Sequence, residues 1–256
     1  MQESAMGETD LVLPGRMPAV VHRTYNPFDP FGGTAGFELG TGPGWALSVD
    51  AVLLELSPTL RRLILPGNSR SDFVRQANGA FANAADQEFS GALLTAGTQG
   101  AHTLRLKDGT TWRFTAGWIP IGRPGTIPGL GLLVEQADRN GNHLTIERDV
   151  NGFITRLVEP AGRALVFTHT NGRLTEIRDP IGRTVRYSYN AARRLETATN
   201  SAGGVTRYTY DPQGRILTIT DARGILYLTN EYDASGRVVR QIEADPDGAG
   251  PEVAGE

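Results

Sequence analysis

The sequence predicts an all-β protein whose second half is a repeat array folded as a curved antiparallel sheet. Three observations predict this fold class. Glycines recur every 20 to 22 residues, the segments between them alternate polar and apolar residues, and the junctions have the composition of tight turns. A fixed period of this length is typical of architectures built by stacking one supersecondary unit.

Two interleaved sets of glycines define the period. One set precedes a bent apolar strand, and in the other set Gly182 and Gly203 are followed by tyrosines five and seven positions later. Because both sets keep one period over about a hundred residues, we interpret them as structural turns of a repeat. The predicted turn glycines are Gly141, Gly152, Gly162, Gly172, Gly182, Gly203, Gly214, Gly224 and Gly236, and Arg193 once replaces a glycine.

Each half-repeat has the pattern of a strand followed by a turn. In Thr184 to Tyr189, Val185, Tyr187 and Tyr189 alternate with polar residues, which is a strand signal. Junctions such as Asp211-Pro212-Gln213-Gly214 combine a residue that caps its own turn with a glycine that accepts positive φ. The repeat aromatics are Tyr187, Tyr189, Tyr208, Tyr210 and Tyr232.

The other half-repeat breaks strict alternation. Its apolar residues lie three positions apart, as in Leu174 and Ile177, and we place the same spacing at Ile216 and Ile219 and at Val239 and Ile242. A β-bulge turns two such residues to one face and bends the strand. We therefore predict a bulge in each of these strands.

The pattern divides the chain into four segments. We expect a disordered tail over residues 1–9, an irregular β-rich module over 10–131, an array of about five repeats over 132–243, and a disordered acidic tail over 244–256. Within the module, Asp108-Gly109 lies between two alternating runs and predicts a hairpin turn. Phe81 to Phe89 is the one place where a short helix is expected.

Composition limits the classes of function. The formal net charge of −3 gives no basic surface for nucleic acid, and the absence of cysteine excludes disulfides and thiolate chemistry. No run of about 18 apolar residues predicts a membrane span. The first ten residues are polar and acidic and do not resemble a signal peptide. We expect a cytosolic protein, export by another route, or a piece of a longer chain.

The repeat resembles the Rhs/YD-repeat family, whose signature is Tyr-Asp, two residues, then Gly-Arg. The signature occurs at Tyr210 to Arg215 and at Tyr232 to Arg237, and a weaker copy at Tyr189 to Arg194 has Asn for Asp and Arg for Gly. The first part of the chain is similar to the module that precedes the repeats, through Leu13-Pro14-Gly15 and Gly42-Pro43-Gly44-Trp45 among others.

The resemblance implies a sheet wound into a hollow, cocoon-like shell. Such shells enclose a C-terminal toxin domain or present a surface in adhesion and signalling. The implied partners are the remainder of the shell, a toxin domain in the same or another chain, a secretion apparatus and cell-surface glycans, with no nucleic acid. The implied location is secreted or at the cell surface, reached through a larger polypeptide or a specialised system. No cofactor, metal or catalytic residue is carried over.

Residues with catalytic potential have simpler explanations. None of the four histidines has a partner at metal-ligand spacing, and His169 occupies a position where sister repeats have tyrosine. Asp138 to Glu147 resembles a calcium loop, but its glycine and glutamate are misplaced for an EF-hand, so a turn is preferred. We expect the arginines after the glycines to pair with turn aspartates on neighbouring repeats. Those arginines are Arg163, Arg173, Arg183, Arg215 and Arg237.

Three hypotheses of function follow from the sequence. The first is a non-enzymatic encapsulating module, which should have an unpaired strand edge near Tyr232 to Ile242. The second is a carbohydrate- or cell-surface-binding module that uses exposed tyrosines, the alternative being that those tyrosines pack as cross-strand neighbours. The third and weakest is a hydrolase with a cleft in Ser69 to Gly100, which would require perturbed acids in one pocket.

Overall fold

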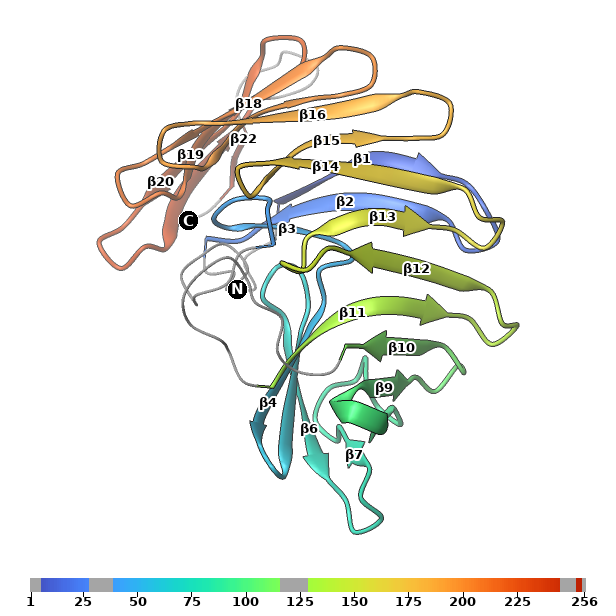
Figure 1. The fold of residues 1–256 in the computed structure, drawn as a ribbon. Coiled ribbons are helices and arrows are strands. Elements are labelled where there is room, and N and C mark those ends of the chain that lie inside the picture. Colours follow the sequence, from blue (N-terminus) through green and yellow to red (C-terminus); the bar gives the residue numbers. More distant parts are fainter. Residues whose placement is uncertain (1–5, 28–38, 116–128, 245–251, 255–256) are drawn as a thin grey trace. The chain divides into compact units, whose positions relative to one another are not determined.

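The computed structural model describes residues 6–27, 39–115, 129–244 and 252–254 (Figure 1). The chain divides into two compact units, Met1–Gly182 and Arg183–Glu256. Apart from one short 3₁₀ helix, η1 (Thr98–Gly100), the regular structure of the described residues is β-strand. The predicted all-β class is therefore confirmed. No helix in the part of the chain that the structure describes is long and apolar enough to cross a membrane.

The first unit begins with a three-stranded antiparallel sheet of β1 (Met6–Leu13), β2 (Ala19–Tyr25) and β3 (Trp45–Leu47). The predicted tail over residues 1–9 is wrong for residues 6–9, because they form the start of β1; residues 1–5 lie outside the described residues. The acidic residues suit the strand because Arg23 pairs with Glu8 at 2.9 Å and with Asp10 at 2.6 Å. Arg23 is itself buried and lies 5.1 Å from the centre of the Trp45 ring.

Strands β4 to β11 follow as a closed ring. Each strand pairs with the next, and Leu130–Leu132 of β11 pairs back to Val52–Leu54 of β4. The ring strands are β4 (Val52–Ser57), β5 (Leu60–Ile64), β6 (Arg70–Arg75), β7 (Phe81–Ala82), β8 (Leu93–Ala96), β9 (His102–Arg105), β10 (Thr111–Phe114) and β11 (Leu130–Ala137). The expected hairpin at Asp108-Gly109 joins β9 to β10.

The ring is filled by side chains that are distant in sequence. Phe73 and Phe89 are each 1% exposed, and their ring centres lie 5.8 Å apart in an edge-on arrangement. Phe89 also meets Trp112 edge-on at 6.4 Å. The expected helix from Phe81 to Phe89 is wrong: Phe81–Ala82 is a strand, and turns carry Phe89 inward, where it packs.

The repeat array starts from the ring without a break in pairing. Glu135–Ala137 of β11 pairs with β12, so the expected boundary at 131/132 falls within a strand that the ring and the array share. Residues 116–128, which precede this expected boundary, lie outside the described residues. In the first unit the array consists of β12 (His143–Arg148), β13 (Ile154–Val158), β14 (Ala164–Thr170) and β15 (Arg173–Arg178), all antiparallel.

The N-terminal segments contact this part of the array. The side chain of Arg163, in the turn before β14, donates to the backbone oxygen of Pro14 in the β1–β2 turn. The N–H of Leu174 donates to the backbone oxygen of Gly40 at 2.9 Å. The expected module and the first repeats are therefore joined within one compact unit.

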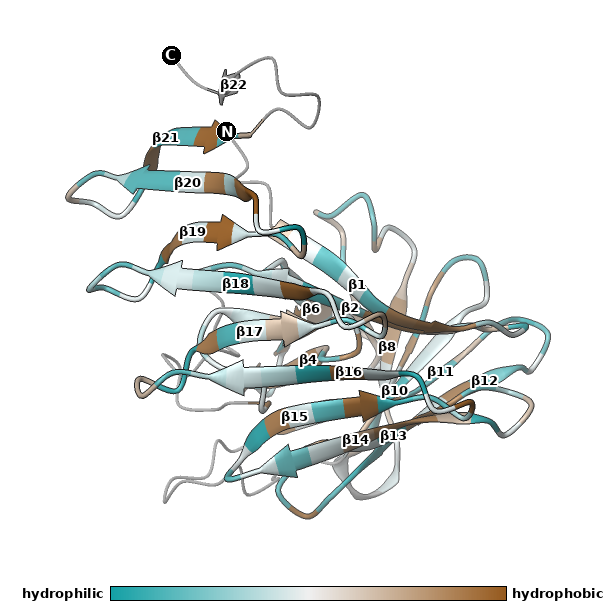
Figure 2. Cartoon of the chain, turned by 90° about the horizontal axis from the view of Figure 1, so that it is seen from above, coloured by the Kyte–Doolittle hydropathy of each residue, from teal (hydrophilic) through white to brown (hydrophobic). Residues whose placement is uncertain are grey.

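The second unit continues the repeat as an antiparallel sheet. Its strands are β16 (Thr184–Tyr189), β17 (Leu195–Thr199), β18 (Val205–Tyr210), β19 (Ile216–Thr220), β20 (Leu226–Tyr232), β21 (Val238–Glu243) and β22 (Glu252–Ala254). Figure 2 shows apolar residues within β17, β19, β20 and β21, and hydrophilic turns between β18 and β19 and between β20 and β21.

Two sequence predictions about the end of the chain need correction. Glu252–Ala254 is the strand β22, so the expected tail over 244–256 is wrong there; residues 245–251 and 255–256 lie outside the described residues. The strand pairs with Gln241–Glu243 of β21, so the edge expected to be free near Tyr232 to Ile242 is partly covered. The alternating run Glu252-Val253-Ala254 is too short to be recognised against its acidic surroundings.

The predicted bulges are present. In β17, the register passes from Thr197, opposite Ser188, to Leu195, opposite Tyr189, and leaves Glu196 as the extra residue. The bulge turns both Leu195 and Ala198 to the buried face. Equivalent shifts occur in the pairs β12–β13, β14–β15, β18–β19 and β20–β21.

The bulge in β21 shifts the repeat alignment expected from the sequence by one residue. Tyr232 lies opposite Val238 and Glu231 lies opposite Arg240, so Val239 is the extra residue. The counterparts of Ile216 and Ile219 are Val238 and Gln241, and the pair Val239 and Ile242 was out of phase. The Gly-Arg phase of the repeat selects the observed alignment, because Val238 follows Arg237 as Ile216 follows Arg215.

Candidate functional site

The repeat turns share one hydrogen-bonding scheme. In the turn from Asp211 to Arg215, the N–H of Asp211 donates to the Arg215 oxygen at 2.9 Å, and the N–H of Gly214 donates to the Asp211 oxygen at 2.9 Å. The Asp211 side chain accepts the Arg215 N–H at 2.8 Å. The same scheme, with the same spacing, is present at Asn190, Asn200, Asp221 and Asp233 in the second unit.

All nine glycines singled out from the sequence have φ between +70° and +89°. In this left-handed region an L side chain is disfavoured by about 1–2 kcal/mol. Arg193, which stands in the glycine's place, also adopts it, with φ of +61°. The turn is thus imposed on Arg193 by its surroundings, since its own conformational preference opposes it.

The signature tyrosines hold successive repeats together. The Tyr210 hydroxyl donates to the backbone oxygen of Leu195 at 2.6 Å, and the Tyr232 hydroxyl donates to that of Ile216 at 2.6 Å. Each bond reaches back to the residue after the signature arginine of the preceding repeat. Those arginines lie over the same rings, Arg194 at 5.6 Å from the centre of Tyr210 and Arg215 at 4.2 Å from that of Tyr232.

The tyrosines two positions earlier belong to the core. Tyr187 is 6% exposed and lies opposite Ala198, and Tyr208 is 5% exposed and lies opposite Ile219. Tyr189, the remaining repeat aromatic, is half-buried. Buried rings favour the packing interpretation over a sugar platform at Tyr187 and Tyr208. In the last repeat the corresponding cross-strand pair is Asn230 and Gln241.

Two of the five arginines after the turn glycines, Arg163 and Arg215, pair with an acid of their own turn, which corrects for these two the expectation of pairing between neighbouring repeats. Arg215 contacts the Asp211 carboxylate at 2.6 Å through both Nε and a terminal nitrogen, and Arg163 contacts Glu159 at 2.9 Å. The turn places the acid and the arginine, which are four residues apart in sequence, within contact distance of each other. Burial raises the pKa of Asp211, but hydrogen bonds from Arg215 outweigh it and hold that pKa below its usual range.

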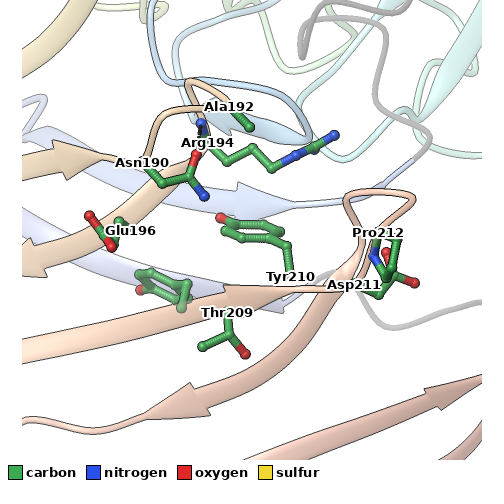
Figure 3. A pocket seen from close by; sticks show the side chains of 9 residues that line it. Asn190, Ala192, Arg194, Glu196, Thr209, Tyr210, Asp211 and Pro212 are labelled. Carbon is green, nitrogen blue, oxygen red and sulfur yellow. Dashed lines mark hydrogen bonds between the residues drawn. The ribbon is translucent and has the colours of Figure 1, made fainter.

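A pocket of about 360 Å³ lies beside the turns at Asn190 and Asp211 in the second unit (Figure 3). Arg194 crosses above the Tyr210 ring, and Glu196 lies on the other side of the pocket from Asp211 and Pro212. The pocket is lined by Asn190, Ala192, Arg194, Glu196, Tyr208, Thr209, Tyr210, Asp211 and Pro212. The sequence indicated the turn residues but not that they border a cavity.

The histidine and acid patterns have structural roles. His169 lies opposite Leu174, as Tyr189 lies opposite Leu195, and its ring stacks on Phe153 at 5.0 Å. Burial lowers the pKa of His169 to about 4, so it is neutral at physiological pH. Asp138, the start of the calcium-like segment, accepts hydrogen bonds from Asn140 and Asn142 of its own turn. Within the described residues, no three His, Asp or Glu side chains gather as a metal site.

The region considered for hydrolysis contains a paired acid. Asp72 receives two hydrogen bonds from Arg62, at 2.7 and 2.8 Å, and these lower its pKa. A general acid at neutral pH needs the opposite shift.

One buried charged pair, Asp50 and Arg148, is not among the residues that the sequence pattern indicated. Asp50 is fully buried, and one of its oxygens lies 3.8 Å from Arg148 but accepts no hydrogen bond from any residue that the structure describes. Arg148 donates instead to the backbone oxygens of Leu133, Gly152 and Val49, at 3.0, 2.9 and 3.2 Å. Burial raises the pKa of Asp50 to about 6, although Arg148 favours the charged form. Nothing in the sequence pattern links residues 98 positions apart.

Comparison with known proteins identifies the repeat. The sequence profile described as RHS Repeat matches residues 169–206 and 197–225. No curated protein sequence matches the chain.

Several solved structures are similar to this chain. The crystal structure of TcdB2-TccC3 is 15% identical with a TM-score of 0.38, and that of TcdB2-TccC3-Cdc42 is 14% identical with a TM-score of 0.40; each alignment covers 88% of this chain and 12% of the other. A Tc holotoxin pore from Photorhabdus luminescens is 14% identical with a TM-score of 0.34, over 91% of this chain and 14% of that one. This chain therefore spans less than a sixth of the length of each of these structures.

Proposed function

Because the chain carries RHS repeats, we propose that it is a non-enzymatic wall module of an Rhs-type shell that encloses or presents an effector domain. The mechanism is steric: a sheet bent at every repeat shields a polypeptide from solvent and protease. The proposed partners are the remainder of the shell and a toxin domain, in the same chain or another. The proposed location is outside the producing cell, reached through a larger polypeptide or a specialised secretion system.

One observation carries this proposal: the recurrent polar groups of the repeat are engaged in holding the repeat together. The Tyr210 and Tyr232 hydroxyls bind backbone oxygens of the preceding repeat, and the Asp211 carboxylate binds the side chain and backbone of its own turn. Groups committed in this way contribute to a stable wall and are not available for proton transfer. A structural role therefore explains the repeated chemistry.

Protease protection tests the proposal. The chain is produced together with the polypeptide encoded directly downstream of it, in the same reading frame where that frame continues, and both are digested with a nonspecific protease. We expect the downstream polypeptide to survive digestion that destroys it when it is produced alone. Equal digestion rates with and without the chain would rule out an enclosing role.

A matched variant shows whether the wall is responsible. Tyr210→Phe with Tyr232→Phe removes two hydrogen bonds between repeats, each worth about 1 kcal/mol, and retains the rings. We expect faster digestion of the enclosed polypeptide. Thr206→Val, in the same strand, replaces a hydroxyl that forms no hydrogen bond with any described residue; it serves as the control and should leave the protection unchanged.

A further inference from the structure

The turn at Asn190 differs in one functional group from the two turns in which a carboxylate pairs with an arginine. In the turns at Asp211 and Glu159, a carboxylate sits four residues before an arginine and pairs with it, at 2.6 and 2.9 Å. The turn from Asn190 to Arg194 has the same backbone scheme, but an amide replaces the carboxylate. The Asn190 oxygen accepts the backbone N–H of Arg194 at 3.0 Å, and no ion pair forms.

Arg194 is held in place without a counterion. One terminal nitrogen donates to the Gly214 oxygen at 2.8 Å, and the guanidinium lies over the Tyr210 ring. Contact with Gly214 is so close that a methyl group added there would overlap the guanidinium. An arginine has five side-chain N–H donors, and this one forms no ion pair with any described carboxylate. Its position is fixed while donors remain for another group.

The charges around the pocket favour a carboxylate ligand over a phosphate. The Asp211 carboxylate is compensated by Arg215, so it adds little net charge. Glu196 lines the same pocket with its carboxylate exposed. A doubly charged phosphate would be repelled by Glu196 more strongly than a singly charged carboxylate. Arginine and carboxylate also match in planar geometry, as Arg215 and Asp211 illustrate.

We propose that Arg194 is a receptor for an acidic side chain of a partner polypeptide, which supplies the carboxylate that this turn lacks. The ligand carboxylate would take the place that Asp211 has beside Arg215, and the adjoining pocket would hold the neighbouring peptide groups. This site does not depend on the enclosing role, because it requires only a polypeptide that reaches the turn.

Nuclear magnetic resonance of the arginine Nε–H groups tests the site directly. Titration with sodium acetate should shift the Arg194 signal and leave the Arg215 signal unchanged, because the Asp211 carboxylate already binds the Arg215 guanidinium. One solvent-accessible ion pair contributes about 0–1 kcal/mol, so the affinity for acetate alone will be weak. Equal shifts at both arginines, or a shift at neither, would refute the proposal.

Substitutions in the turns provide matched variants. Asn190→Asp should supply the carboxylate internally and weaken acetate binding by about fivefold or more, because the tethered group has a high effective concentration. Asn200→Asp adds the same charge to a turn of the same geometry, where residue 204 is a glycine, and should change nothing. Asp211→Asn should make the Arg215 signal shift when acetate is added. If Asn190→Asp binds acetate as the unmodified chain does, the assignment is wrong.

Two further probes separate the possible sources of the charge. A blocked peptide with a single aspartate should shift Arg194, and the same peptide with asparagine should not. Inorganic phosphate should shift it less than acetate does at equal concentration. A stronger response to phosphate than to either carboxylate would replace the peptide ligand with a phosphate-bearing one and overturn the proposal as stated.

Discussion

The ring of strands β4 to β11 and the repeats of β16 to β21 are both antiparallel sheet, but different interactions hold them. The ring depends on side chains far apart in sequence, such as Phe73, Phe89 and Trp112, and on the pairing of β11 with β4. The repeats depend on turns of five residues and, at Tyr210 and Tyr232, on a tyrosine bond to the preceding repeat. A substitution in the ring core should therefore lower the free energy of unfolding more than a substitution in a repeat turn.

This difference follows from the range of the contacts. In a repeat, every unit interacts mainly with its neighbours, so stability approximates a sum of local terms. A closed ring has no such independence, because removing one core side chain affects every strand that packs on it. Three predictions examine this contrast, in order of decreasing effect.

The largest effect is expected in the ring core. Phe73→Ala should lower the free energy of unfolding by about 3–5 kcal/mol, because it leaves a cavity beside Phe89. Val74→Ala, the neighbouring position on the same strand but 51% exposed, is the control and should cost about 0.5 kcal/mol or less. Urea unfolding measures both. Similar costs at the two positions would mean that the ring core is not packed as described.

A smaller effect is expected at the buried pair that connects β12 with the segment before β4. The pKa of Asp50 in the folded chain is about 6, against 3.8 for an unperturbed aspartate, so folding favours its protonated form. Its contribution to stability is fully present below pH 3.8 and is lost as the pH rises through 6. The loss is on the order of 3 kcal/mol between these limits.

Asp50→Asn should remove this part of the pH dependence. We expect the difference in unfolding free energy between the original chain and the variant to change over pH 4–7, whatever constant cost the variant carries from leaving Arg148 beside a neutral group. Asp149→Asn, an exposed position next to Arg148, is the control. A constant difference across that range would contradict the role assigned to Asp50.

The smallest effects are expected in the repeat turns, and they have opposite signs. Gly203→Ala should cost about 1 kcal/mol from backbone strain alone, since an added methyl group meets nothing within 4 Å. Arg193→Gly should relieve the same strain and stabilise by about 0.5 kcal/mol after the entropy cost of glycine. Thermal unfolding checks both, with Arg193→Ala as a control that retains the strain. A loss of stability in Arg193→Gly greater than in Arg193→Ala would refute the account.

The sequence by itself determined the repeat. Its period, its glycine turns and the bulges predicted from the spacing of Leu174 and Ile177 all follow from interactions within about 20 residues, and such interactions leave a regular pattern. The pairing of Asp211 with its own Arg215 is also local, although the partner expected from the sequence was on a neighbouring repeat.

Only the tertiary structure decided the rest. The closure of β11 onto β4, the pairing of Asp50 with Arg148 and the docking of Arg163 on Pro14 join residues that are 78, 98 and 149 positions apart. The same holds for β1, whose acidic residues fold into a strand because a buried Arg23 meets them. Contacts over such separations form when the whole chain packs, and they impose no period on the sequence. The repeat could be predicted because each of its turns is specified by residues that are close together in sequence.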